Sequence, residues 1–404
     1  MKSILYLSSI AVVLIMSAGC HNKPFDATTE INYCISQATR TLKEIPSDTL
    51  SPRNIPQGSR HWHYVGIHDW TSGFWPGILW YIYQDTRDDR WKLAADSFSM
   101  SLKPDAYRKS FDHDLGFMLY NSLGNGYRLT GDTAYKQILL AAADSLATLF
   151  NPRVGTILSW PSMVQKMGWP HNTIIDNMMN LELLFWAAKN GGGERLKDIA
   201  VTHAETTMAH QFRPDYSNYH VVVYDSATGK VLKRVTHQGY ADSSMWARGQ
   251  AWAIYGFTMV YRETREAKFL RFAEDVAGIY LKRLPADKVP FWDFDAPHTA
   301  DEPRDASAAA IAASALLELS TYVKDQDSSR RYYQDAVDML KSLSSDKYQS
   351  RDQTDAFLLH STGSKPDNSE VDVPIIYADY YYLEALLRLE RLQKHEPIFS
   401  VSGD

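Results

Sequence analysis

Cysteine is scarce in this chain. Its 404 residues contain two cysteines, Cys20 and Cys34. Two thiols cannot form the dense disulfide framework that stabilises small secreted domains, so the fold must depend on a large apolar core. The hydrophobic fraction of 45% and the charged fraction of 22% are those of an ordinary globular protein, which agrees with such a core.

The chain also lacks a basic run and the motifs of common cofactor sites. Its net charge is −6, so it does not have the electrostatic pattern of a nucleic-acid-binding protein, and we expect no nucleic-acid partner. The 13 histidines include no pair with the helical spacing of a metalloprotease. No glycine-rich phosphate loop or Gly-x-Ser-x-Gly elbow occurs. We expect neither a cofactor nor a catalytic metal.

The N-terminus has the layout of an export signal. Lys2 precedes an almost wholly apolar stretch, residues 4–16, and Ser17-Ala18-Gly19 leads into Cys20. This pattern predicts a lipoprotein signal peptide over residues 1–19 and a lipid on Cys20. The apolar stretch is too short for a membrane-spanning helix. We expect an exported periplasmic or cell-surface lipoprotein of a Gram-negative-type bacterium, which touches the membrane only through this lipid. An ordinary signal peptide with a chance cysteine is the alternative.

The remainder, residues 20–404, is predicted to be one domain built from about twelve helices. Short turns at 130–132 and 190–193 join some of them into antiparallel pairs. The predicted helices cover residues 27–43, 71–85, 88–103, 112–128, 132–149, 171–189, 193–210, 244–262, 265–282, 304–322, 327–344 and 371–391.

The two helices of a pair differ in how their apolar residues are distributed around the helix. Residues 177–186 are apolar on nearly all sides, whereas their partner, residues 194–210, is amphipathic. The first therefore belongs inside and the second outside. Repeated pairs of this kind predict an all-α fold, an (α/α)6 barrel or six-hairpin toroid, with a two-layer helical solenoid as the alternative. Residues 220–225 and 229–235 predict a small β-hairpin insertion.

Aromatic residues are abundant, with 11 Trp, 24 Tyr and 15 Phe. Flat rings can stack on the apolar faces of sugars, so this composition favours a carbohydrate ligand. Most of these rings are nevertheless expected to pack in the core.

Two aspartates are the main catalytic candidates. Asp114 and Asp176 lie near the starts of two predicted apolar helices. Each could be a helix cap, although Asp112 fits that role better than Asp114 and the apolar residues before Asp176 do not suit a cap. Two carboxylates on separate helices can share one pocket, as glycoside-cleaving enzymes require. Burial would raise the pKa of one of them above the ordinary value of about 3.9.

Three further segments could line a pocket. Within residues 236–252, Arg248 could bind a carboxylate and Gln238 a hydroxyl group, although a surface arginine beside packed tryptophans is the alternative. Residues 69–77 are a ring-rich helix start, and residues 360–366 form a polar loop that could border a pocket mouth or be a plain connection.

Five motifs follow one another along the chain. They are Trp-Thr-Ser-Gly-Phe-Trp-Pro-Gly at 70–77, His-Asp-Leu-Gly-Phe at 113–117, Ile-Ile-Asp-Asn-Met-Met-Asn-Leu at 174–181, Gln-Gly-Tyr-Ala-Asp-Ser-Ser-Met-Trp-Ala-Arg-Gly-Gln-Ala-Trp at 238–252 and Glu-Val-Asp-Val-Pro-Ile-Ile-Tyr-Ala-Asp-Tyr-Tyr-Tyr-Leu-Glu at 370–384. In this order they resemble the unsaturated glucuronyl hydrolases of glycoside hydrolase family 88, over nearly the whole mature chain.

The resemblance implies a fold, a reaction and two catalytic residues. The fold is an (α/α)6 barrel. The reaction removes a 4,5-unsaturated uronic acid from the non-reducing end of lyase-generated oligosaccharides of the glycosaminoglycan type, by hydration of the C4=C5 double bond. Asp176 would be the acid and base, and Asp114 would hold ring hydroxyls and tune Asp176.

The resemblance also implies a set of substrate-binding residues. Trp75 and Trp160 would stack on sugar rings, with Trp169 competing for the place of Trp160. The family's sulfate-binding loop has the pattern Ser-x-x-Ser-x-Lys, but here Lys directly follows the second Ser, so acceptance of sulfate is open. The implied residues are His113, Trp75, Trp160, His220, Gln238, Trp246, Arg248, Trp252, Ser361, Ser364 and Lys365.

Three alternatives stay open. The related unsaturated rhamnogalacturonyl hydrolases share the fold and a similar aspartate, although the pair His113-Asp114 favours the glucuronyl family. A non-catalytic glycan-binding lipoprotein would use the same aromatic pocket without depending on Asp176. An ordinary glycosidase on the same barrel would cleave saturated uronides.

Overall fold

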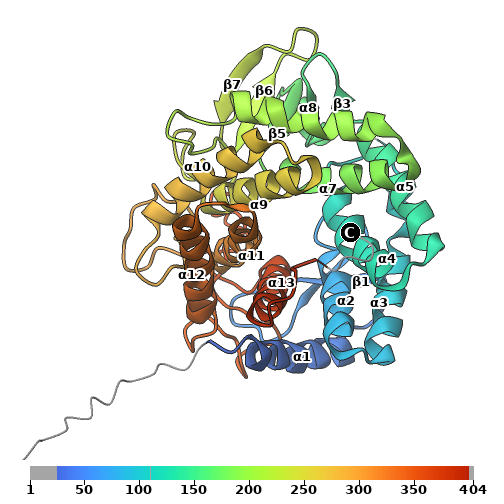
Figure 1. Cartoon of the computed structure of the whole chain (residues 1–404), viewed down its shortest axis with the longest axis vertical. Helices are drawn as coiled ribbons and strands as arrows, with labels where there is room; N and C mark the ends of the chain where they lie inside the picture. Colours follow the sequence, from blue (N-terminus) through green and yellow to red (C-terminus); the bar gives the residue numbers. More distant parts are fainter. Residues whose placement is uncertain (1–24, 110, 400–404) are drawn as a thin grey trace, which may run out of the picture.

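The computed structural model describes residues 25–109 and 111–399. The predicted signal peptide, residues 1–19, and the predicted lipid-bearing Cys20 lie outside these ranges. Within the two described ranges, no helix is long and apolar enough to cross a lipid bilayer. Figure 1 shows the helices as two concentric rings, one around the barrel axis and one outside it.

Six helical segments form the inner ring. Each lies against the next, and the last lies against the first, so the ring is closed. These segments are buried around most of their circumference because their sequences are apolar on nearly all sides. They are α2 (Phe74–Thr86), the π-helix η2 (Gly116–Gly124) with its continuation α4 (Asn125–Thr130), α7 (Asn177–Ala187), α9 (Ala247–Thr264), α11 (Ala306–Tyr322) and α13 (Ile376–Gln393).

Six amphipathic helices surround this ring, each packed on an inner partner. Several of them begin at an aspartate whose side chain accepts a backbone N–H, which contributes about 1 kcal/mol to each helix start. The closed double ring confirms the predicted (α/α)6 barrel and excludes an open solenoid. The outer helices are α1 (Ala27–Glu44), α3 (Asp89–Ser101), α5 (Thr133–Ala147), α8 (Glu194–His210), α10 (Ala267–Arg283) and α12 (Gln326–Leu343).

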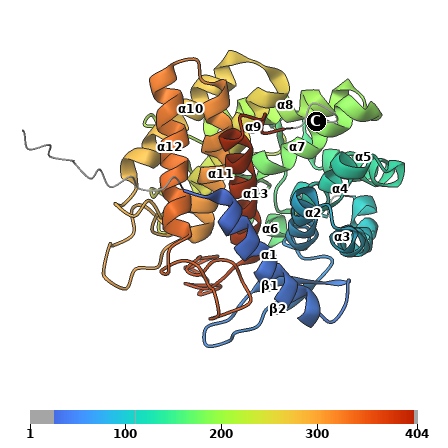
Figure 2. The same cartoon turned by 60° about the horizontal axis from the view of Figure 1, so that its bottom comes forward.

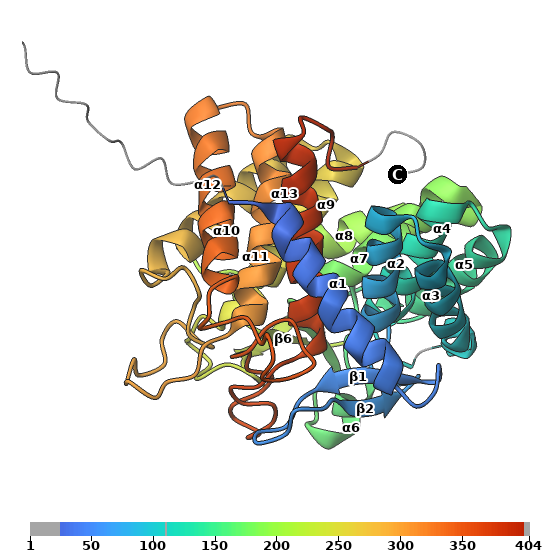
Figure 3. The same cartoon turned by 90° about the horizontal axis from the view of Figure 1, so that it is seen from below.

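The ring is closed by the two ends of the chain. In Figures 2 and 3, α1 (blue) lies across α13 (dark red), with which it is in contact. The outer partner of the last inner helix is therefore the first helix of the described chain.

Two inner helices, α7 and α13, begin five or more residues later than their apolar pattern predicts. Residues 171–174 are strand β5 (His171–Ile174), and α7 begins at Asn177. The strand forms because it pairs with residues about fifty positions further on, which local periodicity cannot reveal. Residues 371–375 are not helical, and Pro374 disfavours a helical conformation for the residue before it.

The predicted hairpin is present and belongs to a larger sheet. Strands β6 (Val221–Tyr224) and β7 (Val231–Val235) are antiparallel, and β5 adds to the other side of β6, with Ile174 opposite Val221. The remaining short elements are the hairpins β1 (Leu50–Asn54)–β2 (His63–Gly66) and β3 (Phe150–Asn151)–β4 (Thr156–Ile157), the helix α6 (Pro161–Lys166), the 3-10 helix η1 (Lys103–Tyr107) and the π-helix η3 (Ala188–Gly192).

Aromatic rings fill the middle of the barrel. Phe117 lies 5.2 Å from Trp252 and 5.5 Å from Phe74, measured between ring centroids. Tyr381 lies 5.3 Å from Trp252, and Tyr377 lies 5.9 Å from Phe74. We call these five residues the aromatic floor, because they separate the two ends of the barrel.

A belt of charged and hydroxyl groups lies below this floor. The carboxylate of Glu384 accepts hydrogen bonds from Tyr81 (2.6 Å) and Tyr255 (3.1 Å), and it pairs with Arg388 at 3.4 Å. Arg388 in turn donates to the Tyr255 hydroxyl at 2.8 Å and pairs with Glu318 at 3.1 Å. The belt therefore joins α2, α9, α11 and α13 across the barrel.

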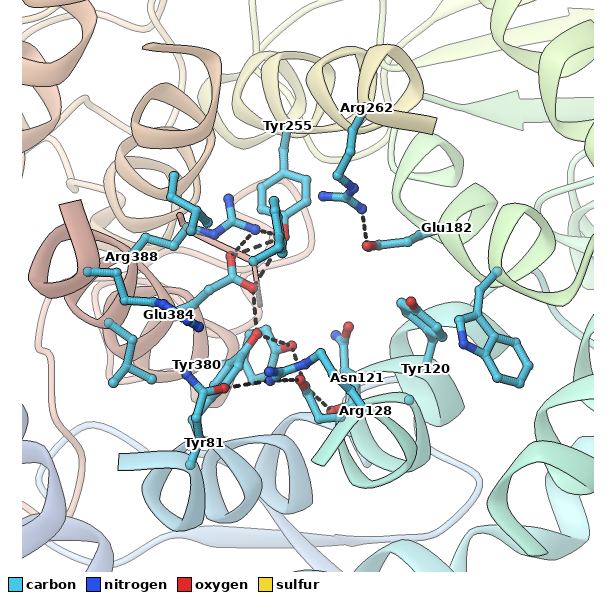
Figure 4. A pocket seen from close by; sticks show the side chains of 18 of the residues that line it. Tyr81, Tyr120, Asn121, Arg128, Glu182, Tyr255, Arg262, Tyr380, Glu384 and Arg388 are labelled. Atoms are coloured by element: carbon cyan, nitrogen blue, oxygen red, sulfur yellow. Dashed lines mark hydrogen bonds and ion pairs between the residues drawn. The ribbon is translucent and has the colours of Figure 1, made fainter. Parts of the chain in front are cut away.

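The belt continues to α7 and surrounds a pocket. Arg262 pairs with Glu182 of α7 and with Glu318 at 3.0 Å. Figure 4 shows Glu182, Arg262, Glu384 and Arg388 around a pocket of about 880 Å³, a volume that includes space open to solvent. Phe399 lies over the guanidinium groups of Arg262 and Arg388, at 4.6 and 5.4 Å. The lining residues come from the middle and C-terminal parts of the inner helices, so the pocket lies at the opposite end from the helix starts.

Replacement of Arg388 tests the belt. In Arg388→Met, the carboxylates of Glu384 and Glu318 lose a buried partner, and we expect the free energy of unfolding to fall by about 3–5 kcal/mol. The control is Arg330→Met, which breaks an exposed pair with Asp327 on α12 and should change stability little. Urea unfolding measures both; equal effects of the two substitutions would contradict a structural role for the belt.

Candidate active site

The segments that precede the inner helices meet at one end of the barrel, because all six inner helices begin there. Figure 3 shows loops, the hairpin β1–β2 and α6 gathered at this end. Asp114 lies just before η2, Asp176 just before α7, and residues 361–375 lead into α13. Helix N-termini carry partial positive charge, so this end of the barrel favours an anionic ligand.

Asp114 is a buried carboxyl group with polar neighbours. The amide Nδ2 of Asn180 donates to its Oδ1 at 3.3 Å, and Nε2 of His113 lies 3.5 Å from the same oxygen. Burial, with the charges of Asp112 and Asp176, raises the pKa of Asp114 well above its usual range. Asp112 accepts the backbone N–H of Asp114 at 3.2 Å, but the N-cap residue of η2 is Leu115, so Asp112 stabilises the turn before the helix and is not its cap.

Asp176 stands at the N-cap position of α7. Its side chain makes no capping bond to any described backbone N–H, which excludes the helix-cap interpretation. Burial raises its pKa to about 7, while the charge of Arg248 and the nearby indole N–H of Trp252 act in the opposite direction. The carboxyl group therefore titrates near neutrality, as a group that both gives and accepts a proton must.

His220 lies beside Asp176, with its Nε2 3.7 Å from Oδ2 of the carboxyl group. The backbone N–H groups of His237 (3.2 Å) and Gln238 (3.1 Å) both donate to Nδ1 of His220. A nitrogen that accepts hydrogen bonds carries no proton, so the ring proton lies on Nε2 and faces Asp176. Burial lowers the pKa of His220 well below its usual range, which keeps the ring neutral.

Arg248 is buried and is held by protein groups. Its Nη1 donates to Asp305 Oδ2 at 2.8 Å and to the carbonyl of Thr362 at 2.5 Å, and its Nη2 donates to the carbonyl of Gly363 at 2.6 Å. Its guanidinium also lies 4.5 Å from the ring of Trp246. These contacts fix the loop before α13; a direct contact of Arg248 with a substrate stays a prediction.

Trp160, Trp246 and Gln238 form the wall of the site around His220. The ring of Trp160 lies 5.8 Å from that of His220, and the ring of Trp246 lies 4.5 Å from it. Gln238 donates to the carbonyl of Gly363 at 3.2 Å, which joins this wall to the 361–365 loop. Trp252 lies beneath, in the aromatic floor.

Trp75 has a core position. It is 1% exposed, and its ring meets Phe98 of α3 edge to face. That position between α2 and α3 does not suit the stacking role predicted for it. Trp70, in the same motif, is partly exposed and packs against Phe117 and Tyr377 at the upper edge of the floor. Trp169, the competitor of Trp160, is buried in a separate cluster with strand β5.

Two polar side chains of the 361–365 loop are already paired with carboxylates of the protein. Ser364 donates to Asp367 at 2.7 Å, and Nζ of Lys365 lies 2.5 Å from Oε1 of Glu302. The hydroxyl of Ser361 is buried and has no hydrogen-bond partner within the described ranges.

Among residues 25–109 and 111–399, two groups of side chains could hold a metal ion. Asp112, His113 and Asp114 offer donor atoms within 4.8 Å of one another at the site itself, and a second group, Glu44, His61 and Asp355, does so elsewhere. The expectation that no metal takes part stays a prediction.

Sequence reasoning missed Asn180 as a site residue. It follows Asp176 by four positions, one helical turn along the same face of α7, and this spacing could have identified it. It also packs on η2: a Cβ added to Gly116 would lie 2.6 Å from Cα of Asn180, so only glycine permits this approach.

A helical barrel with two buried carboxyl groups at its mouth is the architecture of a glycoside hydrolase. The chain belongs to Glycosyl Hydrolase Family 88, whose model matches residues 40–386. The predicted family, fold class and enzyme activity are thereby confirmed, and the non-catalytic binding protein is excluded.

Relatives and solved structures agree with this membership. An unsaturated glucuronyl hydrolase of Formosa agariphila is 46% identical over 346 residues, covering 84% of this chain and 85% of the relative. The crystal structure of an unsaturated glucuronyl hydrolase specific for heparin is 45% identical, with a TM-score of 0.87 and 91% and 98% of the two chains covered. A Streptococcus agalactiae enzyme of the same name, in complex with dGlcA-GalNAc6S, is 31% identical with a TM-score of 0.77, covering 90% of each chain.

The raised pKa of Asp176 predicts a pH-dependent effect on stability. An unfolded aspartate titrates near ~3.9, but the folded carboxyl group titrates at about 7. The stabilising contribution of this group is therefore complete below pH ~3.9 and is lost as the pH rises through 7. Asparagine cannot ionise, so we expect Asp176→Asn to gain stability over the parent protein between about pH 4 and pH 8, by on the order of 2–4 kcal/mol. Urea unfolding at several pH values measures this gain, and parallel pH curves for the two proteins would contradict it.

Proposed function

We propose that this hydrolase removes a 4,5-unsaturated uronic acid from the non-reducing end of lyase-generated oligosaccharides of the glycosaminoglycan type. The observation that supports it most is the state of Asp176, a buried carboxyl group that titrates near neutrality beside a neutral imidazole. Such a group can protonate a carbon–carbon double bond and then accept a proton from water. The names of the relatives support the same substrate class.

The proposed reaction is a hydration. The Asp176 carboxyl group gives its proton to C4 of the unsaturated ring, and the electrons of the C4=C5 bond form the new C4–H bond. Water adds its oxygen to C5 and returns one proton to the Asp176 carboxylate, so the enzyme ends as it began. The hemiketal at C5 is unstable, opens, and releases the neighbouring sugar. No displacement takes place at the anomeric carbon, so the distance rule for retaining and inverting glycosidases does not apply.

Asp114 has an assisting role in this proposal. Burial and the neighbouring aspartates raise its pKa, which favours the protonated form, and a protonated carboxyl group can donate a hydrogen bond to a ring hydroxyl. A neutral Asp114 also avoids a second negative charge beside the substrate carboxylate. Trp160 and Trp70 would provide the aromatic faces against which a sugar packs.

We propose that the loop before α13 limits sulfated sugars. Lys365 is paired with Glu302, and Ser364 is bonded to Asp367, so this loop offers a sulfate group little positive charge. A sulfate placed there would have to displace an ion pair. Unsulfated neighbours should therefore be accepted better than sulfated ones at this position.

A panel of unsaturated disaccharides tests the reaction. Hydration removes the C4=C5 bond, so absorbance in the near ultraviolet should fall on incubation with chondroitin-, heparin- or hyaluronan-derived fragments, fastest with unsulfated ones. Asp176→Asn should lower kcat by about 10²–10⁴-fold and still bind the disaccharide. The control is Asp327→Asn, an exposed substitution on α12 that should leave turnover unchanged.

Two results of this panel would contradict the proposal. One is an absence of absorbance loss with every fragment. The other is cleavage of saturated uronides, which hydration cannot process and which would indicate an ordinary glycosidase.

We also propose that the enzyme is exported and anchored by a lipid on Cys20. The apolar stretch at residues 4–16, followed by Ser17-Ala18-Gly19-Cys20, supports this proposal.

Labelling of the two cysteine variants tests the anchor. In cells fed labelled palmitate, the parent protein should carry label and sediment with membranes, and Cys20→Ser should lose both properties. Cys34→Ser is the matched control: this thiol is buried in α1, so its loss should change neither. Label that persists in Cys20→Ser would contradict the anchor.

A further inference from the structure

The orientation of the Asn180 amide is fixed by a backbone group. The N–H of Phe117, in the first turn of η2, donates to Oδ1 of Asn180 at 2.9 Å. A carbonyl oxygen accepts and an amide nitrogen donates, so Nδ2 must point the other way. There it faces Nδ1 of His113 and Oδ1 of Asp114, each at 3.3 Å. Asn180 is completely buried, so solvent cannot replace these bonds.

This contact decides where His113 carries its proton. The Asn180 amide can only donate, so Nδ1 of His113 must accept. A neutral imidazole has one ring proton, which then lies on Nε2. Burial, and to a lesser extent the charge of His203, lower the pKa of His113 to about 3, so the ring stays neutral at physiological pH.

The Nε2–H of His113 is a donor without a partner. It is buried and forms no hydrogen bond to any residue in ranges 25–109 and 111–399. The nearest carboxylate oxygens belong to Asp114, at 3.5 Å, and Asp112, at 3.8 Å, both beyond good hydrogen-bond distance. A buried donor left unpaired is unfavourable, so a ligand oxygen that meets it gains binding free energy.

We propose that Asn180 is a positioning residue that fixes His113 as the Nε2–H tautomer, so that His113 donates a hydrogen bond to a substrate oxygen beside Asp114. The identity of the substrate in this proposal rests on the proposed function. The tautomer of His113 does not depend on that function. His220 is held in the same tautomer by backbone N–H groups instead of an amide side chain. Both histidines of the site are then hydrogen-bond donors and not proton carriers, and Asp176 is left as the proton carrier.

The wild-type protein gives the first test. In protein labelled with ¹⁵N in histidine, the ring resonances of His113 are identified by their loss in His113→Gln. We expect Nε2 to carry the proton and Nδ1 to show the shift of a hydrogen-bonded acceptor. A proton on Nδ1, or a doubly protonated ring at neutral pH, would overturn the proposal without any further variant.

A pair of matched variants on α7 gives the second test. Asn180→Leu keeps the branched shape and removes the donor, so the Nδ1 resonance should lose its hydrogen-bond shift and kcat/KM should fall about tenfold, mainly through KM. Asn177→Leu is the control: this asparagine is equally buried on the same helix, but it bonds to Ile157 and Ser159 and not to the His113 ring, so Nδ1 should keep its hydrogen-bond shift. Equal shifts in both variants would indicate general disturbance of the helix and would overturn the proposal.

A double-mutant cycle separates His113 from Asp114, the other partner of Asn180. In a His113→Gln background, Asn180→Leu should lower kcat/KM much less than it does in the parent protein, because the residue through which it acts is gone. If Asn180→Leu lowers kcat/KM as much in this background as in the parent protein, Asn180 acts through Asp114, and the role of the tautomer is overturned. If no unsaturated uronide is turned over at all, the proposed function fails while the resonances of His113 still decide the tautomer.

Discussion

The mouth of this barrel depends on the buried guanidinium of Arg248. It binds the carboxylate of Asp305 at the start of α11 and the carbonyls of Thr362 and Gly363 in the loop before α13, and it stacks on Trp246 before α9. A buried charge is tolerated only when it is fully paired, so movement of any of these segments would leave the guanidinium with an unpaired buried charge. The same positive charge opposes the effect of burial on Asp176. One residue therefore holds the loops together and adjusts the proton affinity of the acid.

The aromatic floor separates two electrostatic environments within one barrel. Above it, carboxyl groups are raised in pKa by burial and stand beside neutral histidines. Below it, the glutamates of the belt are paired with Arg262 and Arg388. The charges that act most on Asp114 and Asp176 belong to Asp112 and Arg248 at the mouth, and not to the belt. The barrel can therefore have a strongly charged interior without fixing the ionisation of its catalytic group.

Periodicity predicted the inner and outer helices well, because each pair differs so clearly in its apolar pattern. It was wrong where long-range contacts determine the secondary structure. The pattern of residues 171–174 predicted the start of a helix, but these residues form a strand that pairs with Val221–Tyr224. It could not separate Trp70 from Trp75 either, since both lie in one motif and only the packing shows which ring faces α3. Asn180 was missed although its spacing from Asp176 places both on one face of α7. Only its bond to the N–H of Phe117, sixty-three positions earlier in the chain, is beyond the reach of a local pattern.

The pairing of α1 with α13 has a consequence for how the chain folds. Five hairpins can associate as they are synthesised, but the ring cannot close until the last helix is available to the first. Until then, the apolar flanks of α2 and α11 have no neighbour, and the contact of α13 with α2 joins residues about three hundred positions apart. Contacts of such sequence separation form slowly and late. The final docking of α13 is thus the event that turns an open arc of hairpins into a barrel, and no catalytic mouth exists before it.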